Sequence, residues 1–149
     1  MTDESLNEHQ KIVVRQSLVD LAASLIGIPY LKEAEWTDYS KFPEALDCSE
    51  MIEGVFRKIG LRMPDGSQNQ YDFCVDIPKC QNGDLGFFGK GASSSKIYHV
   101  GIVWNGLVIE AREHDPKASF ETGKVITRPV EKWKAFSNFV GFRSQPKLV

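Results

Sequence analysis

The sequence predicts a single α+β domain, with helices packed on one face of an antiparallel sheet of about five to six strands. Helical patterns occupy the first part of the chain, short β-type segments occupy the second part, and the two do not alternate as they would in a parallel sheet. At 149 residues, with 42% hydrophobic and 26% charged residues, the chain has the size and composition of one globular domain. No internal repeat or change of composition marks a boundary, so we expect one domain over residues 1–149.

The first helix is expected over residues 7–26. Its apolar side chains recur at helical spacing, at Val14, Leu18, Leu21, Ala22 and Leu25. Gly27 and Pro29 then supply a stop. Residues 29–45, PYLKEAEWTDYSKFPEA, are aromatic and charged without a clear period, so we interpret them as a long surface loop. Long ordered loops are often functional.

A second, better-defined helix is expected from residue 48 to Ile59. Asp47 is placed to cap it, with Glu50 three residues on in the manner of a capping box, and Gly60 ends it. Its buried stripe consists of Met51, Ile52, Val55, Phe56 and Ile59. Cys48 therefore lies in the first turn, on the buried face.

After a PDG turn at residues 64–66 and a polar connection, the periodicity changes to that of strands. The β-type segments are GDLGFF, KIYHVGIVW, LVIEA, KVITRPV and NFVGF. We expect them to form an antiparallel meander.

Asn105-Gly106 is the strongest hairpin signal, because a type I′ turn needs positive φ at both central residues. This turn sets Trp104 opposite Leu107, and counting back sets Gly101 opposite Glu110. Opposed residues share a face, and faces alternate along a strand. One face then carries His99, Gly101, Val103, Val108, Glu110 and Arg112. The other carries Val100, Ile102, Trp104, Leu107, Ile109 and Ala111.

His99 and Glu110 are diagonal neighbours in this register, about 7–8 Å apart between backbones, and Gly101 places no side chain between them. A carboxylate bonded to one ring nitrogen fixes the tautomer and leaves the other nitrogen free to take a proton from a thiol. Cys48 is the candidate thiol, since the first turn of a helix favours thiolate, although Asp47 beside it acts the other way. The alternative is that His99 is a structural strand residue and Cys48 an inert core thiol.

The charge, the N-terminal segment and the hydropathy of the chain argue against several classes of protein. With 18 Lys and Arg against 20 Asp and Glu, the chain has no basic excess, which disfavours nucleic-acid binding. The N-terminus, MTDESLNEHQK, lacks the features of a secretory signal, and no apolar run approaches the roughly 20 residues of a membrane span. We therefore expect synthesis in the cytoplasm, with any action outside the cell depending on another carrier.

The three cysteines are an odd number, which argues against a fully paired disulfide framework. The absence of CxxC and of clustered histidines gives a zinc site little support. Cys74 and Cys80 flank VDIPK and are interpreted as partly buried thiols, with a disulfide between them as the alternative.

Taken together, several segments resemble the NlpC/P60 superfamily of papain-like cell-wall cysteine peptidases. In family order they are GIPY (27–30), DCSEMIEGVFRKIGLRMP (47–64), SQNQY (67–71), NGDLGFF (82–88), HVGIVWNGLVIEA (99–111) and VGFR (140–143). The resemblance implies that Cys48 attacks an amide carbonyl, that His99 activates it and later protonates the amine, and that Glu110 orients His99. It implies no metal or other cofactor.

The resemblance also suggests residues that bind substrate. Tyr30 is expected beside the site, where it positions substrate or stabilises the oxyanion together with the backbone N–H of Cys48; the alternative is a plain loop aromatic. Asp47 and Ser49 are expected to bind a free amino group, with helix capping as the alternative. Arg112 is expected either to pair with Glu110 or to bind a substrate carboxylate, with a solvated strand charge as the alternative.

The sequence also departs from the family pattern. Leu31, Lys32 and Glu33 stand where glycines are common, and the stretch from 31 to 47 is longer than usual. A glutamate at 50 replaces a common glycine, and Glu110 replaces the histidine most often found third. The loop that shapes the substrate groove is therefore altered.

The implied function is hydrolysis of a stem-peptide amide in bacterial peptidoglycan, with the γ-D-glutamyl to diamino-acid bond as the family's usual target. The chain looks like a phage lysin, a tail-associated peptidase or an injected effector; the sequence identifies no immunity or delivery partner. Alternatives are Cys/His chemistry on another amide, transpeptidation, acyl transfer, or a non-catalytic binding module that retains the fold.

Overall fold

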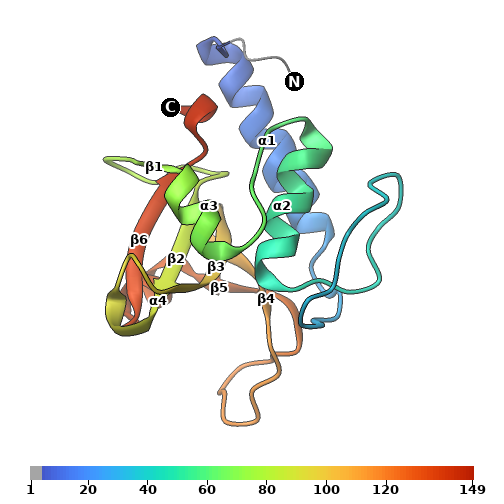
Figure 1. The fold of residues 1–149 in the computed structure, drawn as a ribbon, viewed down its shortest axis with the longest axis vertical. Coiled ribbons are helices and arrows are strands. Elements are labelled where there is room, and N and C mark those ends of the chain that lie inside the picture. The colour runs from blue at the N-terminus through green and yellow to red at the C-terminus, as the bar shows by residue number, and fades with distance from the viewer. Residues whose placement is uncertain (1–4) are drawn as a thin grey trace.

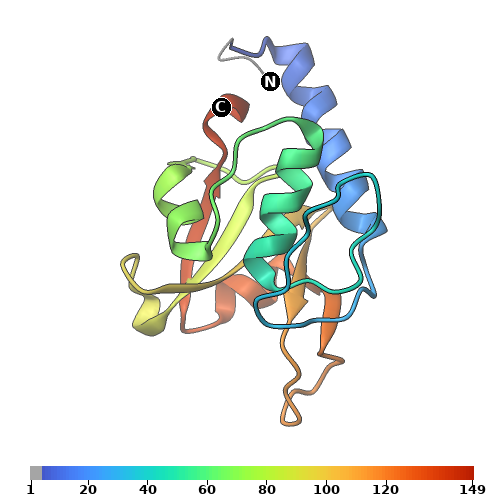
Figure 2. The same ribbon diagram turned by 45° about the vertical axis from the view of Figure 1, so that its right-hand side comes forward.

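The computed structural model describes residues 5–149 and shows an α+β fold with a six-stranded antiparallel sheet (Figure 1 and Figure 2). This confirms the predicted fold class. The first four residues of the acidic N-terminal segment lie outside the described residues. The elements in chain order are α1 (Glu8–Ser24), α2 (Cys48–Ile59), α3 (Ser67–Phe73), β1 (Val75–Asp76), β2 (Leu85–Gly89), η1 (Lys90–Ala92), β3 (Ile97–Trp104), β4 (Leu107–Arg112), β5 (Lys124–Pro129), α4 (Val130–Ala135), β6 (Phe139–Ser144) and η2 (Pro146–Leu148).

The strand order is β1-β6-β2-β3-β4-β5. The strands from β2 to β5 form the expected meander, but the last predicted strand does not continue it. After β5 the chain passes through the short helix α4, and β6 returns to pair with β2 at the other side of the sheet. The expectation of a simple meander was therefore wrong for β6, because the free edge with which a strand pairs is decided by long-range packing.

The hairpin between β3 and β4 has the predicted register. Trp104 pairs with Leu107, and Ile102 pairs with Ile109. Asn105 and Gly106 have φ of 50° and 77°, which is the left-handed pair that a type I′ turn requires. The register fixes which side chains of the hairpin face the same way.

Both main helices form where their sequence signals lie. Asn7 caps α1, and the side chain of Asp47 accepts the Glu50 N–H at the start of α2. Only half of the predicted capping box at α2 forms, because the Glu50 carboxylate instead accepts the backbone N–H of Trp36 at 2.8 Å. A tertiary contact with the long loop has thus replaced the local one.

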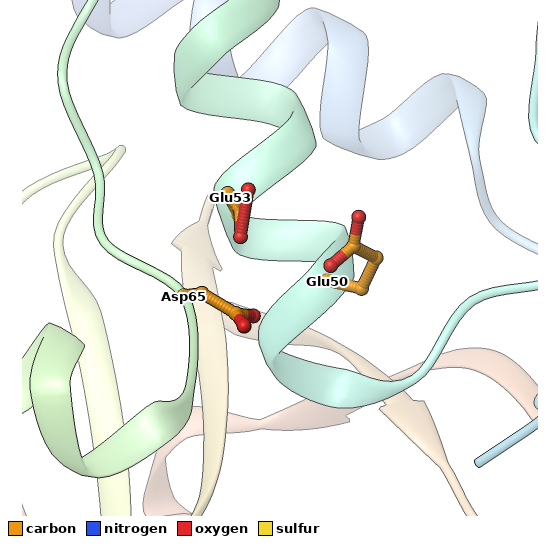
Figure 3. Close-up of side chains that lie close together, drawn as sticks. All are labelled: Glu50, Glu53 and Asp65. Carbon is orange, nitrogen blue, oxygen red and sulfur yellow. The ribbon is translucent and has the colours of Figure 1, made fainter. Parts of the chain in front are cut away.

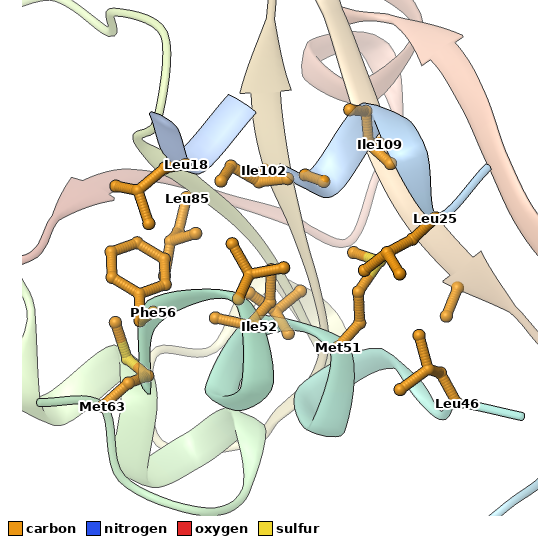
Figure 4. Close-up of a cluster of buried hydrophobic side chains, with 14 of the residues drawn as sticks. Leu18, Leu25, Leu46, Met51, Ile52, Phe56, Met63, Leu85, Ile102 and Ile109 are labelled. Atoms are coloured by element: carbon orange, nitrogen blue, oxygen red, sulfur yellow. The ribbon is translucent and has the colours of Figure 1, made fainter. Parts of the chain in front are cut away.

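The main core lies between the sheet and the helices α1 and α2 (Figure 4). Leu18, Ile52 and Phe56 are fully buried against strand residues such as Ile102 and Ile109. Burial of such side chains stabilises the fold by roughly 1.5–3 kcal/mol each. The core therefore fixes α2, and with it Cys48, over β3.

A second cluster lies on the opposite face of the sheet, where Phe88 and Val108 pack against Trp133 of α4. The sequence did not indicate α4, nor the helix α3, which was read as a polar connection. None of the helices within residues 5–149 is both long and apolar enough to span a bilayer.

Candidate active site

Cys48 is the first residue of α2 and remains partly exposed. Its Sγ lies 3.9 Å from the carbonyl oxygen of Tyr98 on β3, so the helix start and the strand meet at this point. The core contacts of Met51 and Ile52 hold this end of α2 against the sheet. The thiol is thus presented at the surface from a rigid support.

His99 is buried on β3, with 7% of its surface exposed. Its ring stacks between Phe88 and Trp133, at centroid distances of 5.6 Å and 5.5 Å. Nε2 lies 2.9 Å from Oε1 of Glu110, and since that carboxylate is ionised the nitrogen is the donor. The Cys48 side chain lies close enough to act on the charge of the ring and, like Glu110, favours its protonated form.

These contacts raise the pKa of His99. Burial alone would lower it, but the neighbouring Cys48 and Glu110 side chains, which stabilise a positive charge on the ring, outweigh burial and bring the pKa to about 9. The imidazolium is therefore the favoured form near neutral pH.

Glu110 is fully buried and accepts four hydrogen bonds. Besides His99, Arg128 donates through Nε to Oε2 at 2.7 Å and through Nη2 to Oε1 at 2.9 Å. Trp133 donates its indole N–H to Oε2 at 2.8 Å. Burial opposes ionisation, but the donors and the positive charges of His99 and Arg128 bring the Glu110 pKa down to about 2. Glu110 is therefore a fixed negative charge behind His99.

Arg128, rather than Arg112, forms the ion pair with Glu110. It lies on β5 opposite Val108, one diagonal step from Glu110. The pairing of Arg112 with Glu110 that the sequence left open is thus wrong, because another guanidinium already fills the bidentate site. The alternation in KVITRPV was a signal for Arg128, but without the β4–β5 register it could not be placed.

A cleft of about 330 Å³ opens at Cys48. It is lined by Tyr30, Cys48, Tyr98, His99, Arg112, Glu113, His114 and Asp115. Partial burial, followed by the negative charges around it, raises the pKa of Tyr30 to about 12, so the phenol stays a neutral donor. The structure therefore brings together Cys48, His99, Tyr30 and Arg112, with Glu110 behind them. Glu113, His114 and Asp115 were not anticipated.

Asp47 and Ser49 do not line this cleft. Asp47 accepts the N–H groups of Glu50 and Glu33, which is the capping role weighed as its alternative. The Ser49 hydroxyl lies 3.4 Å from Asp47. A substrate-binding role for either residue stays a prediction.

A larger cavity of about 820 Å³ lies beside α2, beneath the loop that carries Trp36. Glu50, Glu53 and Asp65 point toward one another there, with carboxylate oxygens within 4.8 Å (Figure 3). Burial, followed by the Glu50 charge, raises the pKa of Glu53 to about 7. Protonation therefore offsets part of the repulsion within this cluster. The spacing of Glu50 and Glu53 on one helix face was its signal in the sequence.

Cys74 and Cys80 are both free thiols, in agreement with the preferred interpretation. Cys74 is buried, and its pKa is raised to about 12 by that burial. Neither residue lines the cleft at Cys48.

Comparison with known proteins supports the resemblance seen in the sequence. The model of the NlpC/P60 family matches residues 33–132. Peptidoglycan endopeptidase RipB of Mycobacterium tuberculosis is 28% identical over 120 residues, which cover 74% of this chain and 46% of RipB. The probable endopeptidase p60 of Listeria innocua is 41% identical over 78 residues, covering 50% of this chain and 16% of that protein. The chain thus spans less than half the length of these relatives.

Solved structures show the same fold. The structure of RipB superposes with a TM-score of 0.70 at 23% identity, covering 93% of this chain and 67% of that one. The P60 domain of an antigen from M. avium subspecies paratuberculosis gives a TM-score of 0.67 at 23% identity, covering 91% and 96%. At these identities the likeness concerns the fold.

Proposed function

Because the chain belongs to the NlpC/P60 family, we propose that it is a cysteine peptidase that hydrolyses an amide bond in the stem peptide of bacterial peptidoglycan. One observation carries the proposal: a histidine held by a buried carboxylate lies against a cysteine at a helix N-terminus, within a solvent-open cleft. Relatives that bear the name peptidoglycan endopeptidase support the choice of substrate.

In this proposal the Cys48 sulfur attacks the amide carbonyl and forms a tetrahedral intermediate. The backbone N–H of Cys48 and the Tyr30 phenol stabilise the oxyanion. His99 then gives its proton to the amine nitrogen as the C–N bond breaks, which leaves a thioester on Cys48 and releases the amine. Water attacks the thioester while His99 takes its proton, and the sulfur leaves with the acid as product.

Glu110 acts by holding His99. Its hydrogen bond to Nε2 turns the other ring nitrogen toward the thiol and stabilises the imidazolium. Arg128 and Trp133 fix Glu110 in turn, so the ring orientation depends on contacts from β5 and α4. Catalysis of this kind requires no metal.

The finer proposal is that residues 1–149 act as one catalytic domain on the γ-D-glutamyl to diamino-acid bond. Asp47 and Ser49 would bind a free amino group of the stem peptide, and Arg112 a carboxylate. The protein would reach the wall after release, injection or virion delivery.

The test is to incubate the protein with peptidoglycan from several bacteria and to identify released fragments by mass spectrometry. We expect cleavage within the stem peptide by the parent and none by Cys48→Ala. Cys80→Ala is the matched control, since Cys80 is a partly exposed free thiol outside the cleft, and it should keep full activity. Equal release by the parent and Cys48→Ala would contradict the proposal, as would the absence of release by the parent.

A further inference from the structure

Arg112 is one of the residues that line the cleft of Cys48. Among the described residues no carboxylate forms a salt bridge with it, and its Nε is buried with no hydrogen-bond acceptor. The Glu110 carboxylate lies on the same side of the hairpin as Arg112, but it forms its ion pair with the Arg128 guanidinium. No carboxylate of the described residues therefore neutralises the Arg112 guanidinium, and an anion that enters the cleft can pair with it.

The position of Arg112 is held by packing. Its guanidinium lies 5.7 Å from the ring centre of Phe120, and the same ring lies 4.9 Å from the guanidinium of Arg128. The backbone of Arg112 pairs with Lys124 at the end of the β4–β5 ladder. A guanidinium stacked on an aromatic ring loses little further freedom when it binds, so this one is prepared for a ligand.

The charges that line the cleft make Arg112 important for the binding of an anionic substrate. Arg112 is the only Lys or Arg among the residues that line the cleft, whereas Glu113 and Asp115 both contribute carboxylates. Without Arg112 these two carboxylates would outnumber the single positive charge of His99 and disfavour an anionic substrate. A planar guanidinium binds a carboxylate through two parallel hydrogen bonds, which distinguishes it from a neutral carboxamide of the same shape.

We propose that Arg112 is a specificity-determining residue that binds a free carboxylate next to the scissile amide of the substrate. The inference rests on the proposed function and deepens it. A γ-linked glutamyl residue leaves its α-carboxylate free, and a diamino acid with two carboxyl groups offers another. Both sources present the same chemistry, which amidation of the carboxyl group removes.

The test measures binding to Cys48→Ala by calorimetry, so that no probe is consumed. The probes are synthetic stem peptides that contain γ-D-glutamyl–diaminopimelate, with one diaminopimelate carboxyl group used in the following peptide bond. In the first probe the glutamyl carboxylate and the remaining diaminopimelate carboxylate are free, in the second the glutamyl carboxyl is amidated, and in the third lysine replaces diaminopimelate. We expect at least roughly ten-fold tighter binding of the free acid than of one of the two analogues. The analogue that loses affinity identifies which carboxylate Arg112 binds.

Adding Arg112→Gln should abolish this preference, so that acid and analogue bind within about two-fold of each other. Arg112→Lys keeps the positive charge but not the planar guanidinium with its two parallel donors, so it should retain part of the preference. Lys124→Gln is the matched control, because Lys124 is the strand partner of Arg112 but lies outside the cleft, and it should retain the full preference. Circular dichroism checks that each variant is folded; if Arg112→Gln is not, the Lys variant decides. Equal affinity for acid and analogues, a preference that survives both Arg112 changes, or no binding of any probe would overturn the assignment.

The failure of this inference is separable from failure of the proposed function. A parent enzyme that cleaves the free acid and both analogues equally well keeps its activity as a peptidase but refutes the role of Arg112. A parent that binds the acid through Arg112 and cleaves none of the probes refutes the peptidase function on these substrates alone.

Discussion

Glu53→Gln and Glu110→Gln make the same chemical change at two buried carboxylates, and the structure predicts opposite effects on stability. Glu110 is surrounded by donors, with His99, Arg128 and Trp133 bonded to it. Glu53 faces Glu50 and Asp65 instead, with Arg57 as its cation at 3.3 Å. The folded state therefore favours the ionised form of Glu110 and the protonated form of Glu53.

The magnitudes follow from the pKa values. Folding lowers the Glu110 pKa from 4.5 to about 2 and raises the Glu53 pKa from 4.5 to about 7. At about 1.4 kcal/mol for each pH unit, each difference corresponds to about 3 kcal/mol in the free energy of unfolding. For Glu53 this is an upper bound, because the glutamine also loses the ion pair with the half-exposed Arg57.

The two effects also differ in their pH range. The ionised Glu110 stabilises the folded state fully above pH 4.5, and this stabilisation is lost as the pH falls toward 2. The protonated Glu53 stabilises the folded state below pH 4.5, and that stabilisation is lost as the pH rises through about 7. At pH 8, Glu110→Gln should therefore unfold about 3 kcal/mol more easily than the parent, and Glu53→Gln should be more stable by up to about 3 kcal/mol. At pH 4 the gain at Glu53 should have vanished.

Urea denaturation followed by circular dichroism at both pH values measures these differences, with the slope on urea concentration as a check that the unfolded states are comparable. Glu131→Gln is the control. Glu131 is exposed, and its ion pair with Lys134 is long, at 3.8 Å, so its loss should change stability little. Destabilisation by Glu53→Gln at pH 8, or a stability gain that is the same at both pH values, would refute the electrostatic reasoning.

Further predictions concern packing and activity. A Cβ at Gly54 would lie 2.1 Å from the ring of Trp36, so Gly54→Ala should displace that ring and shift tryptophan fluorescence to the red. It should also lower the free energy of unfolding by about 2 kcal/mol, even though alanine has the better helix propensity. Unchanged fluorescence would contradict this. A Cβ at Gly101 would lie 2.5 Å from Val108, so Gly101→Ala should lower stability by about 1–3 kcal/mol in thermal unfolding, and an unchanged midpoint would count against the packing. With the His99 pKa at about 9, kcat/KM should fall above about pH 9, where the imidazolium that protonates the amine is lost; an alkaline limb near 6.5 would contradict the assignment.

Local signals in the sequence predicted the parts of the site that depend on neighbouring residues. Asn105-Gly106 fixed the register of β3 and β4, and with it the approach of His99 to Glu110. Asp47 and Gly60 gave the bounds of α2 and hence the place of Cys48. Each of these features requires only a turn or a cap within a few residues, so the sequence contains the necessary information.

The contributions of β5, α4 and α3 could not be predicted for a different physical reason. Residues 113–123 separate β4 from β5 without a recognisable turn, so the register that brings Arg128 to Glu110 was open. The helices α3 and α4 are seven and six residues long, too short to show an apolar period. The Glu50 carboxylate bonds to Trp36, fourteen residues away, which no capping rule foresees.

The bonds between Arg128 and Glu110 leave no place for Arg112 at that carboxylate. A carboxylate offers about four lone-pair positions, and those of Glu110 are taken by His99, Trp133 and two nitrogens of Arg128. Arg112 therefore has no acceptor to gain at Glu110 even though it lies on the same side of the hairpin, and it lines the cleft of Cys48. Arg128 thus fixes the carboxylate that bonds to His99, and we propose that Arg112 binds an anion that enters beside Cys48.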